Sequence, residues 1–361
     1  MSVSSATPLD VTKAWVQSKF QWKRQITATR FSPCGQFVFA AGIGGAIIRW
    51  DIESEQQVLF ESHGTWVGDF AFDGESKRMY SGDYHGTLTC WDYSLDEPKQ
   101  IWQKAGSHNG WIRKVAVSPD GSTIATGGND LSVRLWNAKG RSTEELDGHQ
   151  GYIFSLIFHP ETGDLFSGDQ LGIVRQWNKK GELSREIDVS ILHTRLDNFL
   201  THVGGVRCMA IDSTRNLLAC GGFTNAKSNS FCPGDPLISI IDLETVTEAI
   251  QLKPVIKADG PINGLCFLSD GTLVGVGEGQ AGASLSFWDI QKPEPIHAIK
   301  MLSGYEVDIH PDGMRLAVSR YKSNGRTGNG RHVLPEEYVS NDGLVEVLQL
   351  SEKPMEDADS A

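Results

Sequence analysis

Short segments in which apolar and polar residues alternate recur along the chain, and each carries a tryptophan near its end. The segments AIIRWDI, TLTCWDY, SVRLWNA, IVRQWNK and SLSFWDI carry Trp50, Trp91, Trp136, Trp177 and Trp288, each followed by Asp or Asn. The spacing is 41 residues from Trp50 to Trp91, 45 to Trp136 and 41 to Trp177. A period of 40–45 residues is too long for a coiled coil and fits a repeating four-stranded unit.

A second spacing supports the same repeat. His63, His108 and His149 each stand 28 residues before the tryptophan of their own unit. Strand triplets a, b and c can be counted seven times, and most are followed by a fourth strand-like piece such as QVLFES, QIWQKA or IHAIKM. The fifth unit is expected to start near His202, with Ile241 replacing the tryptophan. Such units share neighbours, and none buries a core alone.

The best units run from His108 to Asn137 and from His149 to Asn178. They combine a His near a turn, an alternating strand, a turn such as Ser-Pro-Asp-Gly, a strand with Ser/Thr-Gly and a closing Trp-Asp or Trp-Asn. This pattern resembles the WD-repeat β-propeller family from about Lys13 to Leu350. The resemblance implies an all-β fold, a seven-bladed β-propeller of four-stranded antiparallel blades.

The two ends of the chain are expected to meet in the ring. The seventh unit is followed only by the acidic SEKPMEDADSA, so its fourth strand is missing at the C-terminal end. The segment AWVQSKFQW, residues 14–22, alternates apolar and polar and is predicted to supply that strand. The expected organisation is a flexible N-terminus over residues 1–12, the propeller over 13–350 and an acidic disordered tail over 351–361.

Composition narrows the class of protein. The formal charge of −12 over 361 residues argues against sequence-independent binding to nucleic acid or to an anionic membrane. The six cysteines are scattered without a CxxC pair, which favours free thiols and predicts neither a metal site nor a cofactor. The start of the chain lacks a signal-peptide pattern, and no segment reaches the roughly 18–20 apolar residues of a membrane span. A cytoplasmic protein is expected.

The resemblance also implies a hydrogen-bonded structural tetrad inside a blade. The third unit carries all four members: His108, Thr126, Asp130 and Trp136. In the second unit His85 takes the position of the Asp, and in the fourth unit Leu171 does, so both tetrads are expected to be incomplete. Asp169 is offset from that position, and its replacement is expected to be nearly neutral. These histidines and carboxylates are interpreted as structural, because buried polar groups need partners.

A candidate binding surface follows from the same alignment. Aromatic residues stand just before strand a in three successive units, and the residues two positions further on are arginine or phenylalanine. Trp, Tyr and Arg dominate binding hot spots, so this rim of the upper face is predicted to bind a partner. The alternative is that the aromatic residues only cover turns. The predicted contact residues are Trp66, Trp111, Tyr152, Arg113, Phe154 and Arg207.

Insertions are expected to crowd one side of that face. They comprise a long link into the fifth unit, a long b–c loop in the fifth unit and a longer one in the seventh. The seventh-unit loop concentrates basic residues and could receive a carboxylate or a phosphate. The alternative is a mobile glycine-rich loop with solvated charges. The basic residues are Arg320, Lys322, Arg326, Arg331 and His332, of which Arg326 and Arg331 are assigned to the partner site.

The sequence contains no GxSxG, HExxH or comparable catalytic motif. The expected function is a non-enzymatic protein-interaction scaffold that binds a peptide or loop of another protein on the upper face. One alternative is a propeller enzyme or small-molecule binder that uses the channel mouth covered by the inserted loops. A weaker alternative is a structural subunit held in an assembly by its blade edges. The sequence does not identify the partner.

Overall fold

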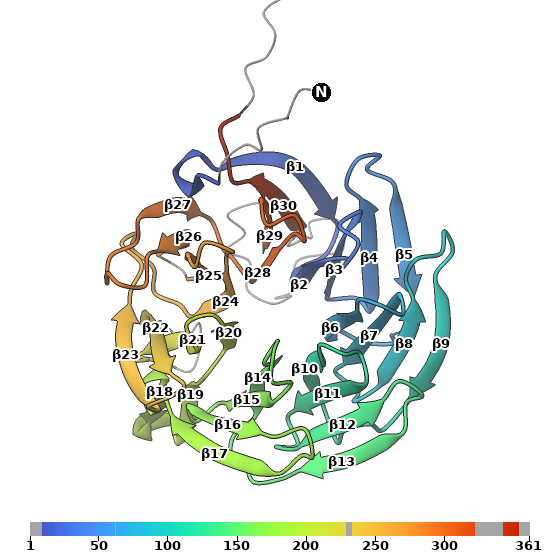
Figure 1. Cartoon of the computed structure of the whole chain (residues 1–361), viewed down its shortest axis with the longest axis horizontal. Helices are drawn as coiled ribbons and strands as arrows, with labels where there is room; N and C mark the ends of the chain where they lie inside the picture. Colours follow the sequence, from blue (N-terminus) through green and yellow to red (C-terminus); the bar gives the residue numbers. More distant parts are fainter. Residues whose placement is uncertain (1–8, 62, 229–232, 280, 322–341, 354–361) are drawn as a thin grey trace, which may run out of the picture.

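The computed structural model describes residues 9–61, 63–228, 233–279, 281–321 and 342–353. Within these residues, seven four-stranded antiparallel sheets stand as blades around a central axis (Figure 1). The first strand of each blade, strand a, lies nearest the axis, and the fourth, strand d, lies at the rim. The prediction of an all-β, seven-bladed propeller is confirmed.

The strands of the first four blades follow one another along the chain. They are β2 (Ile26–Phe31), β3 (Phe37–Gly42), β4 (Ala46–Asp51) and β5 (Gln57–Glu61); β6 (Val67–Asp73), β7 (Arg78–Asp83), β8 (Leu88–Asp92) and β9 (Lys99–Lys104); β10 (Ile112–Val117), β11 (Thr123–Gly128), β12 (Val133–Asn137) and β13 (Ser142–Leu146); and β14 (Ile153–Phe158), β15 (Leu165–Asp169), β16 (Ile173–Trp177) and β17 (Leu183–Asp188).

A small hairpin separates the fourth blade from the fifth. The remaining blades are β20 (Cys208–Asp212), β21 (Leu217–Thr224), β22 (Asp235–Asp242) and β23 (Thr247–Leu252); β24 (Ile262–Phe267), β25 (Leu273–Gly277), β26 (Ala283–Trp288) and β27 (His297–Met301); and β28 (Glu306–Ile309), β29 (Arg315–Tyr321), β30 (Gly343–Gln349) and β1 (Trp15–Trp22). The hairpin is β18 (His193–Leu196) and β19 (Thr201–Gly204), and the three-residue 3₁₀ helices are η1 (Val11–Lys13), η2 (Ser190–Leu192) and η3 (Asp197–Phe199). No helix in the described part of the chain is long and apolar enough to cross a membrane.

The N-terminal strand closes the ring, as predicted. β1 pairs antiparallel with β30 from Trp15 opposite Gln349 to Trp22 opposite Gly343. The buried Phe20 of β1 also stacks on Trp50 of the first blade, with ring centroids 5.6 Å apart. A strand borrowed from the far end of the chain therefore gives the seventh blade its fourth strand and leaves β30 without an open edge.

The expected boundary of the flexible N-terminus at residue 12 is wrong. The backbone N–H of Asp10 donates to the carbonyl of Leu350 at 2.9 Å, and its side chain caps η1 by accepting from the N–H of Thr12. Val11 is buried in the core of the sixth and seventh blades. The chain is therefore packed from Asp10 onward, while residues 1–8 and 354–361 lie outside the described residues.

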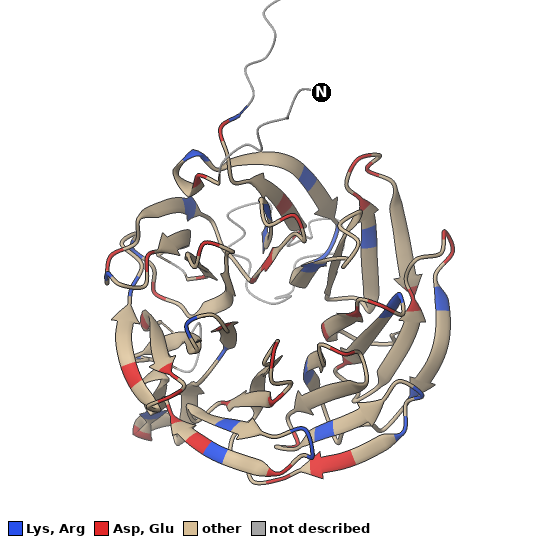
Figure 2. Ribbon diagram, in the orientation of Figure 1, with Lys and Arg blue, Asp and Glu red and all other residues tan. Residues whose placement is uncertain are grey.

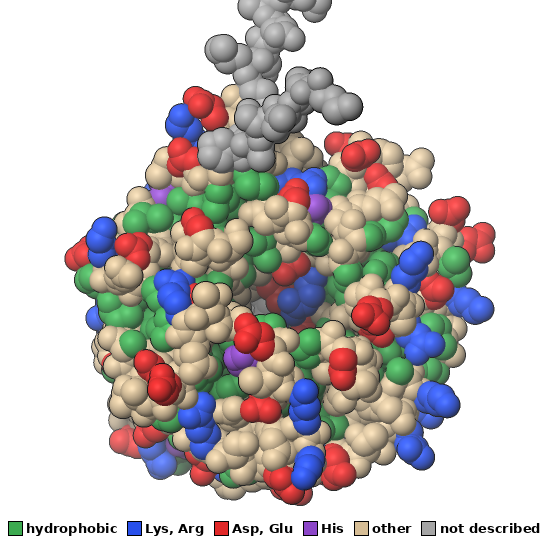
Figure 3. Space-filling model, in the orientation of Figure 1, with side chains coloured by type: hydrophobic (Ala, Val, Ile, Leu, Met, Phe, Trp, Pro, Cys, Tyr) green, Lys and Arg blue, Asp and Glu red, His purple; other side chains and the backbone are tan. Residues whose placement is uncertain are grey.

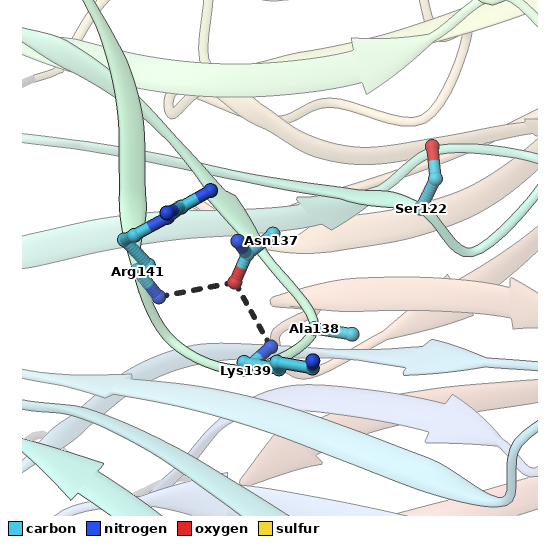
Figure 4. Close-up of a pocket in the computed structure, with 5 residues that line it drawn as sticks. All are labelled: Ser122, Asn137, Ala138, Lys139 and Arg141. Atoms are coloured by element: carbon cyan, nitrogen blue, oxygen red, sulfur yellow. Dashed lines mark hydrogen bonds between the residues drawn. The ribbon is translucent and has the colours of Figure 1, made fainter.

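The residue after each closing tryptophan shapes the turn from strand c to strand d. In the third blade the Oδ1 of Asn137 accepts from the backbone N–H of Lys139 and of Arg141 (Figure 4). This turn lines an open pocket of about 440 Å³ together with Ser122 and Ala138. Asp51 makes equivalent bonds in the first blade. Asp and Asn favour such turns because their side chains bond the backbone two residues on, which explains the Trp-Asp and Trp-Asn pairs.

The hydrophobic cores lie between blades rather than within them. The a strands β2, β6, β10, β14, β20, β24 and β28 contact one another in that order around the axis, and β28 contacts β2. Trp136 of the third blade packs with Tyr80 and Cys90 of the second. The closing tryptophans are between 0% and 7% exposed. Truncating such a side chain to alanine typically costs about 3–5 kcal/mol, so these residues hold neighbouring blades together.

The tetrad of the third blade has the expected hydrogen bonds. Nδ1 of His108 lies 2.8 Å from Oδ1 of Asp130, and its Nε2 lies 2.7 Å from the Oγ1 of Thr126. The indole N–H of Trp136 donates to the same hydroxyl at 2.8 Å. Arg134 adds a fourth contact at 2.6 Å to Asp130. The side-chain hydrogen bonds to His108 and Arg134 hold the pKa of Asp130 far below its usual range, despite burial, so the carboxylate stays charged.

The second and fourth blades also carry complete tetrads, which corrects the prediction. His63 bonds Asp83 at 3.0 Å, and His149 bonds Asp169 at 2.8 Å. The acid is the last residue of strand b in these blades, two positions earlier than Asp130 relative to its histidine. Neither His85 nor Leu171 occupies the acceptor position. The alignment failed because two backbone positions both bring a carboxylate oxygen to the imidazole.

Candidate functional site

Three aromatic side chains line the upper face, the side on which the d–a and b–c loops lie. Trp66, Trp111 and Tyr152 immediately precede β6, β10 and β14 and are 38%, 39% and 39% exposed. This agrees with the exposure expected from the sequence and contrasts with the buried closing tryptophans. Because β6, β10 and β14 contact one another in order, the three side chains belong to neighbouring blades.

A fourth aromatic residue, Tyr84, joins the group and was not among the predicted residues. Its ring stacks on Trp111 with centroids 4.2 Å apart and planes 9° apart, and it lies 5.4 Å from the ring of Trp66. Tyr84 directly follows β7, and its backbone N–H donates to the carbonyl of Trp66. Asn129 and Gln170 make the same backbone bond in the next two blades. Aligning the residue after strand b would therefore have found it.

Two arginines extend the aromatic group toward the fifth blade. Cζ of Arg113 lies 4.8 Å from the ring centroid of Trp111, 5.8 Å from that of Tyr152 and 5.0 Å from that of Phe154. Cζ of Arg207 lies 4.3 Å from the same Phe154 ring. Cations over aromatic faces are attracted by the ring quadrupole. We call Trp66, Tyr84, Trp111, Arg113, Tyr152, Phe154 and Arg207 the upper-face crescent.

Phe154 has a different place from the one expected. It is only 7% exposed and lies beneath the two guanidinium groups, so it supports Arg113 and Arg207 and offers a partner little surface. The Nε–H of Arg113 donates to Oδ1 of Asn129, which fixes the guanidinium. The crescent is thus a set of rings and cations whose side chains hold one another in place.

Burial governs the electrostatics of the crescent. Desolvation lowers the pKa of Arg113 to about 10, and the like charge of Arg207 adds to this effect against the opposing influence of Tyr84 and Tyr152. Burial likewise raises the pKa of Tyr84. At neutral pH Arg113 is still a cation and Tyr84 is still a neutral phenol. The crescent therefore combines apolar rings with cationic groups that are poorly solvated.

The sixth and seventh blades bring an acidic group to the same mouth. Burial raises the pKa of Glu278, against hydrogen bonds from Tyr305 and Asn263 and the charge of Arg207. The rings of Tyr305 and Tyr321 meet edge to face at 5.0 Å. Glu278 directly follows β25, the position that Tyr84 holds in the second blade. The mouth is therefore aromatic and basic on one side and carries a half-buried acid on the other.

Inside the channel, charged side chains of the a strands form a network. Arg30 reaches Asp69 and Glu306, both at 2.9 Å, and Lys114 lies 3.6 Å from each of these carboxylates. Acidic and basic side chains are visible in the central opening (Figure 3) and on the inner strands, in addition to those on the outer strands (Figure 2). Burial raises the pKa of Asp308 to about 6, although Arg30 opposes this. The ion pairs link the seventh, first, second and third blades.

The channel cavity has a volume of about 550 Å³. Charged side chains such as Arg30 and Lys114 line part of it, and apolar side chains such as Phe72, Phe158 and Phe267 line the rest. Across the described residues, no group of three or more His, Cys, Asp or Glu side chains is arranged to hold a metal ion. The charges that face the cavity are engaged with one another across blades, which gives this network a structural role.

The inserted segments only partly match the expectation. His202 lies in β19 of the hairpin, paired with β18, so the fifth blade begins instead at β20. The hairpin packs on the b–c loop of the fifth blade, where the N–H of Ala226 donates to Oγ1 of Thr194. Arg320 pairs with Glu346 through two contacts of 2.7 Å within the seventh blade, so it is not a free ligand for an anion. Lys322, Arg326, Arg331 and His332 lie outside the described residues.

Comparison with known proteins places the repeat in a family. A family model described as "WD domain, G-beta repeat" matches residues 54–92, 100–137 and 140–178. Each match begins near the outer strand of one blade and ends at the Trp-Asp or Trp-Asn pair of the next. The sequence repeat is therefore offset by one strand from the structural blade, the same offset by which β1 closes the ring.

Curated relatives match part of the chain. Polyadenylation factor subunit 2 of Candida albicans is 24% identical over 116 residues, which cover 32% of this chain and 21% of the relative. Small ribosomal subunit protein RACK1y of Oryza sativa is 32% identical over 90 residues, 24% of this chain and 26% of the relative. The guanine nucleotide-binding protein subunit beta-like protein of Encephalitozoon cuniculi is 25% identical over 116 residues, which cover 32% of this chain and 35% of the relative.

The match thus spans about a fifth to a third of the length of these relatives. The described residues of this chain form seven four-stranded blades around a channel. In three of the blades a His and the closing Trp both bond the same Ser or Thr hydroxyl. Three matched WD repeats and a seven-bladed ring in the described residues are consistent with the WD-repeat family.

Proposed function

We propose that this protein is a non-enzymatic interaction scaffold whose upper-face crescent binds a peptide or loop of a partner protein. The observation that carries the proposal is the exposure of Trp111 while its ring is stacked on Tyr84 and contacted by the guanidinium group of Arg113. An exposed tryptophan gains from burial in an interface. Because this one is already held, little side-chain entropy is lost on binding.

The composition of the crescent supports the same proposal. Trp, Tyr and Arg are the residue types enriched at the centres of protein interfaces. Trp66, Tyr84 and Trp111 form a continuous run of rings across two blades, and Tyr152 continues it on a third. The names of two relatives describe a factor subunit and a protein of the small ribosomal subunit, and the third is named as like a beta subunit. A scaffold that contacts other proteins fits such settings.

The test is selection of binding peptides from a displayed library of random 12-residue sequences. Wild-type protein should enrich a set of peptides, and Trp111→Ala should weaken their binding by about 2 kcal/mol or more. The matched control is Ile101→Ala on the outer strand β9, which is similarly exposed at 41% but lies away from the crescent. Equal affinity of the Trp111→Ala and Ile101→Ala proteins for the selected peptides would contradict the proposal.

Folding must be separated from binding in this comparison. Trp111→Ala should leave the thermal midpoint nearly unchanged because the side chain is half-exposed. Trp136→Ala removes a buried side chain that packs against the second blade and should lower the midpoint strongly. The alternative of a small-molecule site in the channel would show itself as a bound mass in native mass spectrometry that survives Trp111→Ala.

A further inference from the structure

We infer that the segment bound by the upper-face crescent is acidic, and that one of its carboxylates pairs with Arg113 and Arg207. This inference rests on the proposed function and names the chemistry of the partner. It starts from the contrast between Arg113 and three other half-buried arginines, Arg30, Arg134 and Arg320, which form ion pairs.

Arg113 lacks the counter-charge that these three arginines have. Arg30, Arg134 and Arg320 each lie within 2.9 Å of at least one carboxylate oxygen. In the part of the chain that the structure describes, Arg113 forms no ion pair, and its Nε–H donates to the neutral amide of Asn129. A guanidinium that is taken out of water without an anion is destabilised, and an incoming carboxylate would relieve that penalty.

The second arginine brings a like charge to the same place. Arg113 and Arg207 both lie against the ring of Phe154, with Cζ at 5.0 and 4.3 Å from its centroid. Their repulsion contributes to the lowered pKa of Arg113. An anion placed between two neighbouring guanidinium groups is attracted by both. Charge-assisted hydrogen bonds of this kind are about twice as strong as neutral ones.

Charge favours a carboxylate over a phosphate group. Three aromatic rings lie near the guanidinium of Arg113, whose planar fork can pair with either group through two hydrogen bonds. Glu278 also interacts electrostatically with Arg207, so one acid of this chain already lies near the two arginines. A carboxylate would add one negative charge beside that acid, whereas a phosphate dianion would add two.

The rings next to the arginines define the neighbouring residue of the partner. Trp66, Tyr84 and Trp111 offer an apolar surface on the side of Arg113 away from Arg207. An aromatic or aliphatic side chain would cover these rings while the adjacent Asp or Glu reaches the arginines. Because the whole chain carries a net charge of −12, long-range repulsion of an acidic peptide opposes this local attraction. Arginine variants therefore test the pairing more directly than salt does.

The experiment uses three displayed libraries of 12-residue peptides on the full chain. All contain Trp, Leu, Ala, Gly and Ser, and they differ in one added pair of residue types: Asp and Glu, Lys and Arg, or Asn and Gln. The acidic library should be enriched above the other two. Fluorescence polarisation of the selected peptides should show at least about tenfold weaker binding to Arg113→Gln. Arg141→Gln, an exposed change on the c–d turn of the third blade, is the control and should bind like wild type.

Three outcomes would overturn the inference. They are equal enrichment of the basic or neutral library, unchanged affinity in both Arg113→Gln and Arg207→Gln, and binding that requires phosphoserine in place of Asp or Glu. Peptides that bind through Trp111 without an acidic residue would leave the proposed function standing and remove the inference alone. Failure of every library to bind in a Trp111-dependent way would remove both. Thermal melting checks the folding of Arg113→Gln, and Arg207→Gln provides a second variant if that protein does not fold.

Discussion

Replacing Asp169 with alanine should be among the most destabilising single changes in the fourth blade. Asp169 is 1% exposed, and its Oδ2 lies 2.8 Å from Nδ1 of His149. Its Oδ1 accepts from the backbone N–H groups of Leu171 and Ile173 at 2.9 and 3.0 Å. His149 in turn bonds the hydroxyl of Ser167 at 2.7 Å. Alanine would leave one buried imidazole N–H and two backbone N–H groups without this acceptor.

The magnitude follows from counting these donors. Each buried unsatisfied group costs about 1–3 kcal/mol, and the two backbone groups belong to a turn that water can partly reach. The free energy of unfolding should fall by roughly 3–5 kcal/mol. Asp130→Ala in the third blade should lower the free energy of unfolding by less, about 1–3 kcal/mol. The N–H of Asn109, which Asp130 also accepts from, is exposed and can bond water instead. Arg134 would still have Glu145 as an ionic partner at 2.7 Å.

Urea denaturation followed by tryptophan fluorescence and circular dichroism measures these differences. Asp169→Asn retains an oxygen for the two backbone donors and should lose only part of the stability, which isolates the contribution of the His149 contact. The control is Asp120→Ala, an exposed acid that accepts hydrogen bonds from Ser118 and Ser122 in a surface turn. If Asp169→Ala unfolds at the same urea concentration as Asp120→Ala, the tetrad does not stabilise the blade in the way described.

Three further predictions concern closure, pH and thiol reactivity. Deleting residues 1–22 removes β1 and exposes the edge of β30, so the thermal midpoint should fall and light scattering should rise through aggregation. Deleting residues 354–361 should change neither. Equal thermal midpoints for the two truncated proteins would contradict ring closure. Burial raises the pKa of Asp308 to about 6, so the folded protein favours the protonated carboxyl. The free energy of unfolding is therefore highest below about pH 4 and falls as the pH rises through 6 and the buried carboxyl ionises. In urea titrations the free energy of unfolding of Asp308→Asn should exceed that of wild type by about 1–3 kcal/mol at pH 8 and equal it at pH 4. The smaller value applies if water in the channel solvates the carboxylate. A difference that does not change with pH would contradict this prediction. Iodoacetamide at pH 8 should label the exposed Cys34 before Cys90, because burial raises the pKa of the Cys90 thiol to about 12; equal labelling in the folded protein would contradict the burial.

The propeller architecture was predictable because the repeat pattern depends on residues that lie close together in the sequence. The spacing of the closing tryptophans and of His63, His108 and His149 marks each blade, and the alternation of residues 14–22 marks the strand that closes the ring. These signals depend on strand periodicity and turn chemistry, which operate within a few residues. The exposure of the aromatic residues before the a strands followed from the same alignment.

Interactions across loops and blades depended on the tertiary structure. The tetrad acid could not be assigned from spacing, because Asp83 and Asp169 at the end of strand b and Asp130 in the following turn all place an oxygen about 3 Å from an imidazole. Arg320 looked like a free cation in the sequence, but the pairing of β29 with β30 sets it beside Glu346.

The sequence by itself therefore determined the number of blades, their order and the closing strand. Only the folded ring decided which side chains meet across it: Tyr84 stacked on Trp111, Arg113 and Arg207 sharing the ring of Phe154, and Arg30 joined to the far end of the chain at Glu306. Strand and turn patterns are encoded in neighbouring residues. Contacts between blades depend on how tightly seven sheets pack around one axis, and no local pattern specifies that distance.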